Sequence, residues 1–126
     1  MSDFSGARSI ELETIDPSSE FVDQLVFKLS SYLPSFGIDI DEDRLRLCVL
    51  HLLYVEQVNH YINLTRITNL DDALVLHILD SLLFLPFIPE GSDTLLDMGS
   101  GPDTLAFLFM LALTFRLLYW IQCPRR

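Results

Sequence analysis

Apolar residues recur at helical spacing in three stretches before residue 91, and polar or proline-containing turns separate them. The first stretch begins at Asp16–Glu20 and closes at Pro34 and Gly37. The second follows the acidic run 39–43 and extends to about His60, and the third lies between the cap at 69–72 and Pro86. The pattern predicts three helices with these apolar positions: Phe21, Val22, Leu25, Val26, Leu29 and Leu33; then Leu45, Cys48, Val49, Leu52, Leu53 and Val55; then Ala73, Leu74, Leu76, Ile78, Leu79, Leu82 and Leu83.

The segments outside these helices differ in kind. Residues 1–15 are polar and unpatterned and are predicted to be a flexible arm, ahead of a helical region over residues 16–90. Residues 91–102 hold a short apolar run, Thr94–Met98, that leads into Gly99-Ser100-Gly101-Pro102. This run predicts a buried strand followed by a tight turn. Residues 103–126 form an apolar tail.

Composition narrows the class of protein. The chain has 126 residues, of which 50% are apolar, and a net charge of −10. Such a chain can bury a core, so disorder as the main state is excluded. Two cysteines exclude a disulfide scaffold and a four-cysteine zinc site, and no metal is expected. The N-terminus shows no signal-peptide pattern, which predicts a cytoplasmic protein.

The charge is unevenly distributed along the chain. Residues 1–102 carry −12, whereas residues 103–126 carry +2 and include 16 apolar residues out of 24. A net negative charge argues against a chain whose main task is to grip phosphates. The two parts therefore call for separate explanations.

The strand and turn at 94–101 carry the strongest chemical signal. Asp97 lies near the strand end, and Gly99 and Gly101 allow the backbone to turn tightly and approach a ligand. With a carboxylate just before the glycines, the usual ligand is S-adenosylmethionine, and the carboxylate faces its cationic amino-acid end. An ordinary strand-to-loop turn is the alternative.

Two further motifs are Asn63-Leu64-Thr65 and His77-Ile78-Leu79-Asp80-Ser81. Spacing of three on a regular helix places His77 and Asp80 on one face, where a carboxylate could orient the imidazole. A histidine that serves only in the core is the alternative.

The order N-L-T, H-I-L-D-S and L-L-D-M-G-S-G-P resembles the small-subunit ribosomal RNA guanine-N7 methyltransferases, historically called glucose-inhibited division protein B. The resemblance covers about residues 45–102 and implies an α/β, Rossmann-like, S-adenosylmethionine-dependent methyltransferase fold, of which this chain holds the helical region, the first strand and the glycine turn only. It implies small-subunit (16S) ribosomal RNA as the partner. The chain departs from the family at Leu76, where Arg is usual, and at Val58, where Trp is frequent.

The resemblance also implies roles for single residues. Gly99, Gly101 and Asp97 match the cofactor-binding positions. Asn63, His77 and Asp80 match motif positions near the mouth of the active site and are candidates for contact with the substrate. No catalytic side chain is assigned beyond these three.

After Pro102 the family pattern stops. The family continues with a third glycine and a P-G-[IL]-P segment, and neither follows here. If one base is added before the codon of Asp103, permitted codons for residues 103–109 regroup to read G-Y-P-G-I-P-F. Residues 110–126 then regroup to a segment containing T-L-L-D-S-V-S-K-K, which matches a later strand of the family. We therefore expect residues 103–126 to be an out-of-frame tail and the chain to be an inactive truncated form.

Two other readings remain open. Leu105–Cys123 is 19 residues long, close to the length of a membrane-spanning helix, so the chain could be a small helical protein with a C-terminal anchor. Alternatively, residues 18–86 could form a helical interaction module. Whichever interpretation holds, association with membranes is expected only through the apolar tail, residues 103–126.

Overall fold

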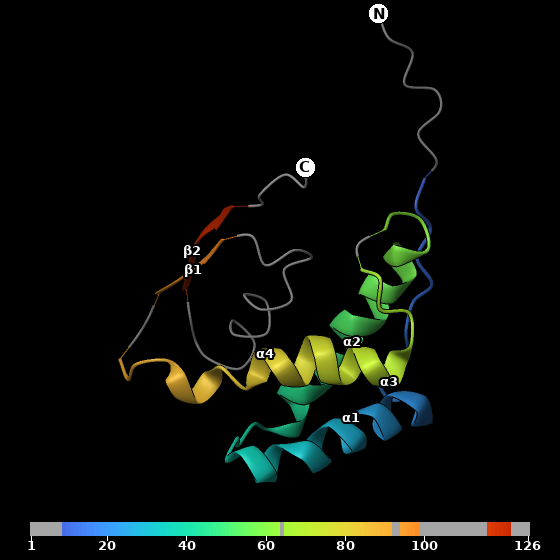
Figure 1. Ribbon diagram of the computed structural model, residues 1–126. Coiled ribbons are helices and arrows are strands. Elements are labelled where there is room, and N and C mark those ends of the chain that lie inside the picture. The colour runs from blue at the N-terminus through green and yellow to red at the C-terminus, as the bar shows by residue number, and fades with distance from the viewer. Residues whose placement is uncertain (1–8, 64, 92–93, 99–115, 122–126) are drawn as a thin grey trace, which may run out of the picture.

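The computed structural model describes residues 9–63, 65–91, 94–98 and 116–121. Over these ranges the chain is mostly helical, with one pair of short strands beside the helices (Figure 1).

The first two predicted helices are confirmed. Helix α1 spans Glu20–Tyr32 and α2 spans Glu42–Asn59. The side chains of Ser19 and Asp41 cap them, each accepting a hydrogen bond from the backbone N–H three residues further on. A short 3₁₀ turn, Leu33–Phe36, follows α1 directly. Local capping chemistry therefore sets where both helices begin.

The third predicted helix forms, but its middle is wider than a regular α-helix. Asn69 caps α3 (Leu70–Ala73), a π-helical segment covers Leu74–Leu79, and α4 covers Asp80–Leu82. At the end of the π segment the N–H of Asp80 donates to the carbonyl five residues earlier. A π turn of this kind changes which side chains share a face and is frequent at functional sites.

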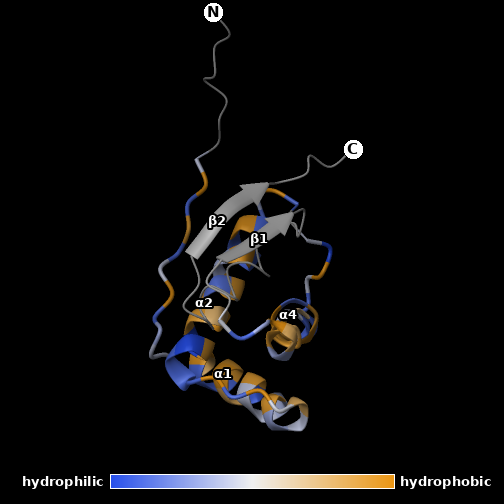
Figure 2. Cartoon of the chain, turned by 90° about the vertical axis from the view of Figure 1, so that its left-hand side faces the viewer, coloured by the Kyte–Doolittle hydropathy of each residue, from blue (hydrophilic) through white to orange (hydrophobic). Residues whose placement is uncertain are grey.

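The hydrophobic core lies where these helices meet. Apolar positions of α1, α2 and the α3–α4 helix face one another (Figure 2). Ion pairs join the helices at the surface: Lys28 Nζ of α1 lies 2.6 Å from Asp71 Oδ1 of α3, and Arg46 Nη1 of α2 lies 2.6 Å from Asp23 Oδ1 of α1. The buried apolar side chains are Val22, Leu25, Val26, Leu29, Leu33, Ile38, Leu45, Cys48, Val49, Leu52, Leu53, Ala73, Leu74, Ile78, Leu79 and Leu82.

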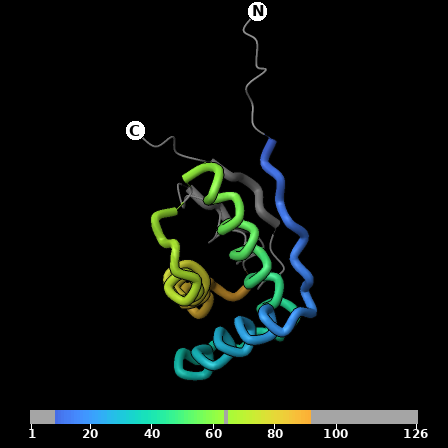
Figure 3. The backbone as a smooth tube through the Cα atoms, turned by 90° about the vertical axis from the view of Figure 1, so that its right-hand side faces the viewer, coloured from blue at the N-terminus to red at the C-terminus, as the bar shows by residue number. Residues whose placement is uncertain are grey.

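The end of the predicted flexible arm is held against α2 (Figure 3). The Gln57 side chain accepts a hydrogen bond from the Glu13 N–H at 2.8 Å and donates one to the Glu13 carbonyl at 3.0 Å. The hydroxyl of Tyr61 donates to the carbonyl of Glu11 at 3.1 Å. These bonds are made by backbone groups of the arm. The contact could therefore not be predicted from the pattern of its side chains. The structure thus places residues 11–15 along α2, and the flexibility of the arm stays a prediction.

A parallel pair of strands follows the helices in sequence. Strand β1 spans Thr94–Met98, as predicted, and β2 spans Arg116–Ile121. Thr94 lies opposite Arg116 and Met98 opposite Ile121, with an irregularity between Leu95 and Leu96. The expectation that the chain holds the first strand only is therefore wrong. A run of apolar and aromatic residues such as 117–121 favours a strand wherever a partner strand is present.

The second strand also bears on the proposed membrane anchor. A continuous helix over Leu105–Cys123 is wrong because Arg116–Ile121 is a strand. Among the helices in the described ranges, none is long and apolar enough to cross a membrane. The rest of the expected out-of-frame tail, residues 103–115 and 122–126, lies outside those ranges.

Candidate functional site

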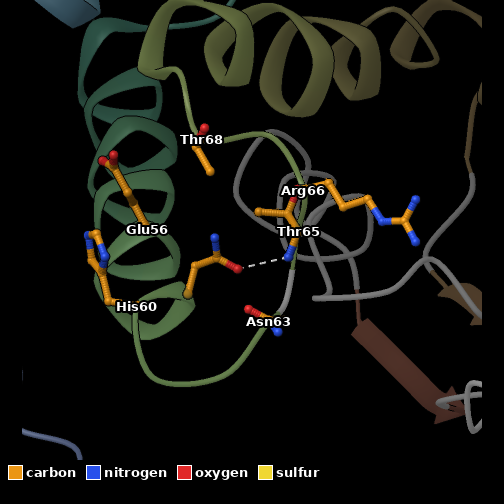
Figure 4. Close-up of a pocket in the computed structure, with 7 residues that line it drawn as sticks. Glu56, His60, Asn63, Thr65, Arg66 and Thr68 are labelled. Carbon is orange, nitrogen blue, oxygen red and sulfur yellow. Dashed lines mark hydrogen bonds between the residues drawn. The ribbon is translucent and has the colours of Figure 1, made fainter.

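An open pocket of about 710 Å³ lies between the C-terminal end of α2 and the loop that leads to α3 (Figure 4). Glu56 projects from the last turn of α2 and His60 from the C-cap position that follows the helix, while Arg66 extends from the loop and away from α2. The pocket is polar and carries both an acidic and a basic group. Its lining residues are Glu56, Asn59, His60, Asn63, Thr65, Arg66 and Thr68.

Hydrogen bonds of Thr65 determine the shape of this loop. The Thr65 N–H donates to Asn59 Oδ1 at 2.9 Å, which ties the loop to the last turn of α2 (Figure 4). The Thr65 hydroxyl oxygen accepts a hydrogen bond from the Ile67 N–H at 3.1 Å. The same oxygen lies 3.0 Å from Nε2 of His77. Thr65 therefore connects α2, the loop and the π-helical segment.

His77 reaches Thr65 from the π-helical segment. Its ring is half-buried, and burial lowers the pKa of His77 below the usual histidine value, which favours the neutral form of the ring. The Ser81 hydroxyl donates to the His77 carbonyl at 2.6 Å, one turn further along. Two of the three sequence motifs thus meet through the contact between Thr65 and His77.

The candidate substrate residues take up different positions. Asn63 is exposed and lines the pocket, whereas His77 lies behind it and contacts the pocket through Thr65. Asp80 is exposed, and the described hydrogen bond of the His77 ring goes to Thr65. The pairing of His77 with Asp80 stays a prediction, which assumed regular helical spacing, whereas the segment that holds His77 is π-helical.

The candidate cofactor residues lie at the other end of the described chain. Asp97 is the penultimate residue of β1 and lies opposite Trp120 in the strand pair. Gly99 and Gly101 fall outside the described residues. In the described ranges no group of three or more metal-ligating side chains gathers at one place.

Sequence reasoning missed several residues of the pocket. Glu56 and His60 stand four apart on one helix face, and Asn59 stands four before Asn63. The signal was a run of polar side chains at the end of α2, just where its apolar positions stop. Thr68 and Arg66 carry no comparable signal because they lie in a loop without periodicity.

Comparison with known proteins shows what part of the chain is similar to. Residues 45–104 match the family described as rRNA small subunit methyltransferase G. The matched range starts within α2 and contains the pocket, the π-helical segment and β1. The resemblance inferred from the three motifs is therefore confirmed for this range.

Individual relatives agree with that match. The ribosomal RNA small subunit methyltransferase G of Methylobacillus flagellatus is 36% identical over 74 residues, which cover 59% of this chain and 35% of the relative. Proteins of the same name from Syntrophotalea carbinolica and Stutzerimonas stutzeri are 38% and 37% identical, covering 59% and 52% of this chain and 34% and 30% of the relatives. The chain spans about a third of the length of these curated relatives, and no solved structure matches it.

Proposed function

We propose that residues 45–98, homologous to the rRNA small subunit methyltransferase G family, are part of an enzyme that methylates N7 of a guanine in small-subunit (16S) ribosomal RNA. The observation that carries this proposal is the contact between Thr65 and His77, which joins two motifs of the family at one polar pocket. On this proposal Asn63 faces the RNA substrate, His77 supports the pocket through Thr65, and Asp80 is a candidate for contact with the substrate.

The chemistry of guanine N7 suits a pocket without a strong base. N7 already carries a free lone pair in the major groove, so it can attack a methyl group without first losing a proton. The side chains around the reacting atoms then need only to hold the base in line with the methyl donor. Amides, hydroxyls and one carboxylate, as in this pocket, can bind a base edge in that way.

The carboxyl end of β1 fits a cofactor. Ligands of open α/β sheets bind at the carboxyl ends of the strands, and β1 ends at Met98. Asp97 lies close to that end, and Gly99 and Gly101 follow directly in the sequence. We propose these three residues for the amino-acid end of S-adenosylmethionine, which supplies the methyl group when bound.

We further propose that residues 103–126 are translated out of frame and that this chain is therefore inactive. The regrouped codons place T-L-L-D at positions 118–121, which lie within β2. The family's later strand and the strand of the structure thus fall on the same stretch of the gene. The frame change would remove the rest of the glycine-rich loop and the carboxylate of the T-L-L-D segment.

The function is tested by methylation of ribosomal RNA. A gene with one base added before the codon of Asp103 should yield a protein that introduces 7-methylguanine into unmodified small-subunit RNA, detected by mass spectrometry of its nucleosides. The chain as given should introduce none. Failure of the restored protein to methylate would contradict the proposed activity, and methylation at another atom would contradict the N7 assignment.

A further inference from the structure

His77 stands apart from Asn63 because it does not itself line the pocket in the described part of the chain, and its ring is hydrogen-bonded to Thr65, which does. The geometry points to His77 as a positioning residue: its Nε2 accepts the hydrogen bond of the Thr65 hydroxyl and thereby fixes the loop that forms one wall of the pocket. The importance of His77 for substrate binding rests on the proposed function, whereas its hydrogen bond to Thr65 is independent of that function.

The direction of this hydrogen bond follows from the partners of Thr65. The hydroxyl oxygen already accepts from the Ile67 N–H at 3.1 Å. If His77 also donated to it, the hydroxyl hydrogen would need another acceptor, and the described part of the chain shows none. On the side of His77, Thr65 borders a crevice of about 10 Å³, at the lower limit of the space that holds one water molecule, whereas on its other side it borders the open pocket. Donation from Thr65 to Nε2 satisfies all three groups, with the remaining ring proton on Nδ1.

Burial favours the same arrangement. A ring in the neutral form that burial favours has one nitrogen free to accept. The crevice around it is mostly apolar, with Leu52, Val55, Ile67 and Leu70 among its walls. In such surroundings a hydrogen bond that is left unmade costs more than in water, so the loop is held in place by the ring.

These hydrogen bonds connect His77 to the wall of the pocket. His77 holds the Thr65 side chain, the Thr65 N–H holds Asn59 Oδ1, and Asn59 lines the pocket. The π-helical segment is what places the ring of His77 at this point of the helix. Loss of the ring acceptor should therefore loosen the loop while every residue that lines the pocket is still present.

The full chain can be tested directly, since it contains three histidines, His51, His60 and His77. With ¹⁵N-labelled histidine at low protein concentration and pH 7.5, nitrogen NMR should show the His77 ring with its proton on Nδ1. Thr65→Val should move the proton to Nε2, the form that free histidine prefers, and Thr65→Ser should restore the Nδ1 form. His60→Gln identifies the signal of the exposed histidine and should leave that of His77 unchanged.

Hydrogen exchange tests whether the ring positions the loop. His77→Phe keeps a ring but removes the acceptor, and the amides of Thr65 and Ile67 should then exchange roughly five- to tenfold faster, the size expected for one net hydrogen bond. His77→Gln, which retains an acceptor, should keep them slow, as should the control His60→Gln. The core amide of Val49 reports whether a variant is still folded.

Two results would overturn the proposal. One is a wild-type His77 ring protonated on Nε2, or a tautomer that Thr65→Val leaves unchanged. The other is unchanged exchange at Thr65 and Ile67 in a folded His77→Phe chain. Neither measurement uses RNA or a methyl donor, so a failure here is distinct from a failure of the proposed methyl transfer.

Discussion

Leu74→Ala should lower the free energy of unfolding by about 2–5 kcal/mol, because it opens a cavity in the centre of the helical core. The Leu74 side chain is 0% exposed and lies in the π-helical segment, among buried residues of α1, α2 and α4. Neighbouring side chains are fixed by three packed helices and cannot collapse fully into the space. Urea unfolding followed by far-UV circular dichroism measures the change.

Leu76→Ala is the matched control, two residues further along the same segment. Its side chain is 54% exposed, so truncation removes little buried area and should change the free energy of unfolding by about 0.5 kcal/mol or less. Equal losses in the two variants would contradict the described orientation of the helix. A loss that is large only for Leu76→Ala would place the core on the opposite face.

The chain as given should show no measurable binding of S-adenosylmethionine in a calorimetric titration. Asp97, Gly99 and Gly101 supply only the first part of the proposed cofactor site, and the segment after Pro102 does not continue the family pattern. The chain with the restored reading frame should bind. Within that restored chain, Asp97→Asn should weaken binding roughly tenfold to a hundredfold, the cost of losing a hydrogen bond to a charged group.

Each outcome of the titration is informative. Tight binding by the chain as given would contradict the proposed break in the site. Absence of binding by a folded, frame-restored chain would contradict the assignment of the glycine turn to this cofactor. Circular dichroism of both chains distinguishes a missing site from a missing fold.

Much of the helical region could be predicted because its determinants are local. Ser19, Asp41 and Asn69 cap the helices where the sequence places polar residues before apolar repeats. Strand β1 was equally clear, since an apolar run stands between two turns. These signals depend on residues only a few positions apart.

The features that escaped prediction depend on contacts between distant residues. Positions 73–83 are apolar on nearly every side, so periodicity could not reveal the π-helical segment or the direction of His77. The arm binds α2 through its own backbone, which leaves no trace in its side chains. The pocket required the Thr65 loop to fold back on Asn59, six residues earlier.

On the proposed function, the chain up to Pro102 is part of a methyltransferase, and the reading frame changes after that residue. The nucleotide sequence of the gene around the codon of Pro102 tests this most directly. We expect that one added base opens a longer frame reading G-Y-P-G-I-P-F and, further on, T-L-L-D-S. A gene in which one added base opens no such frame would contradict the claim.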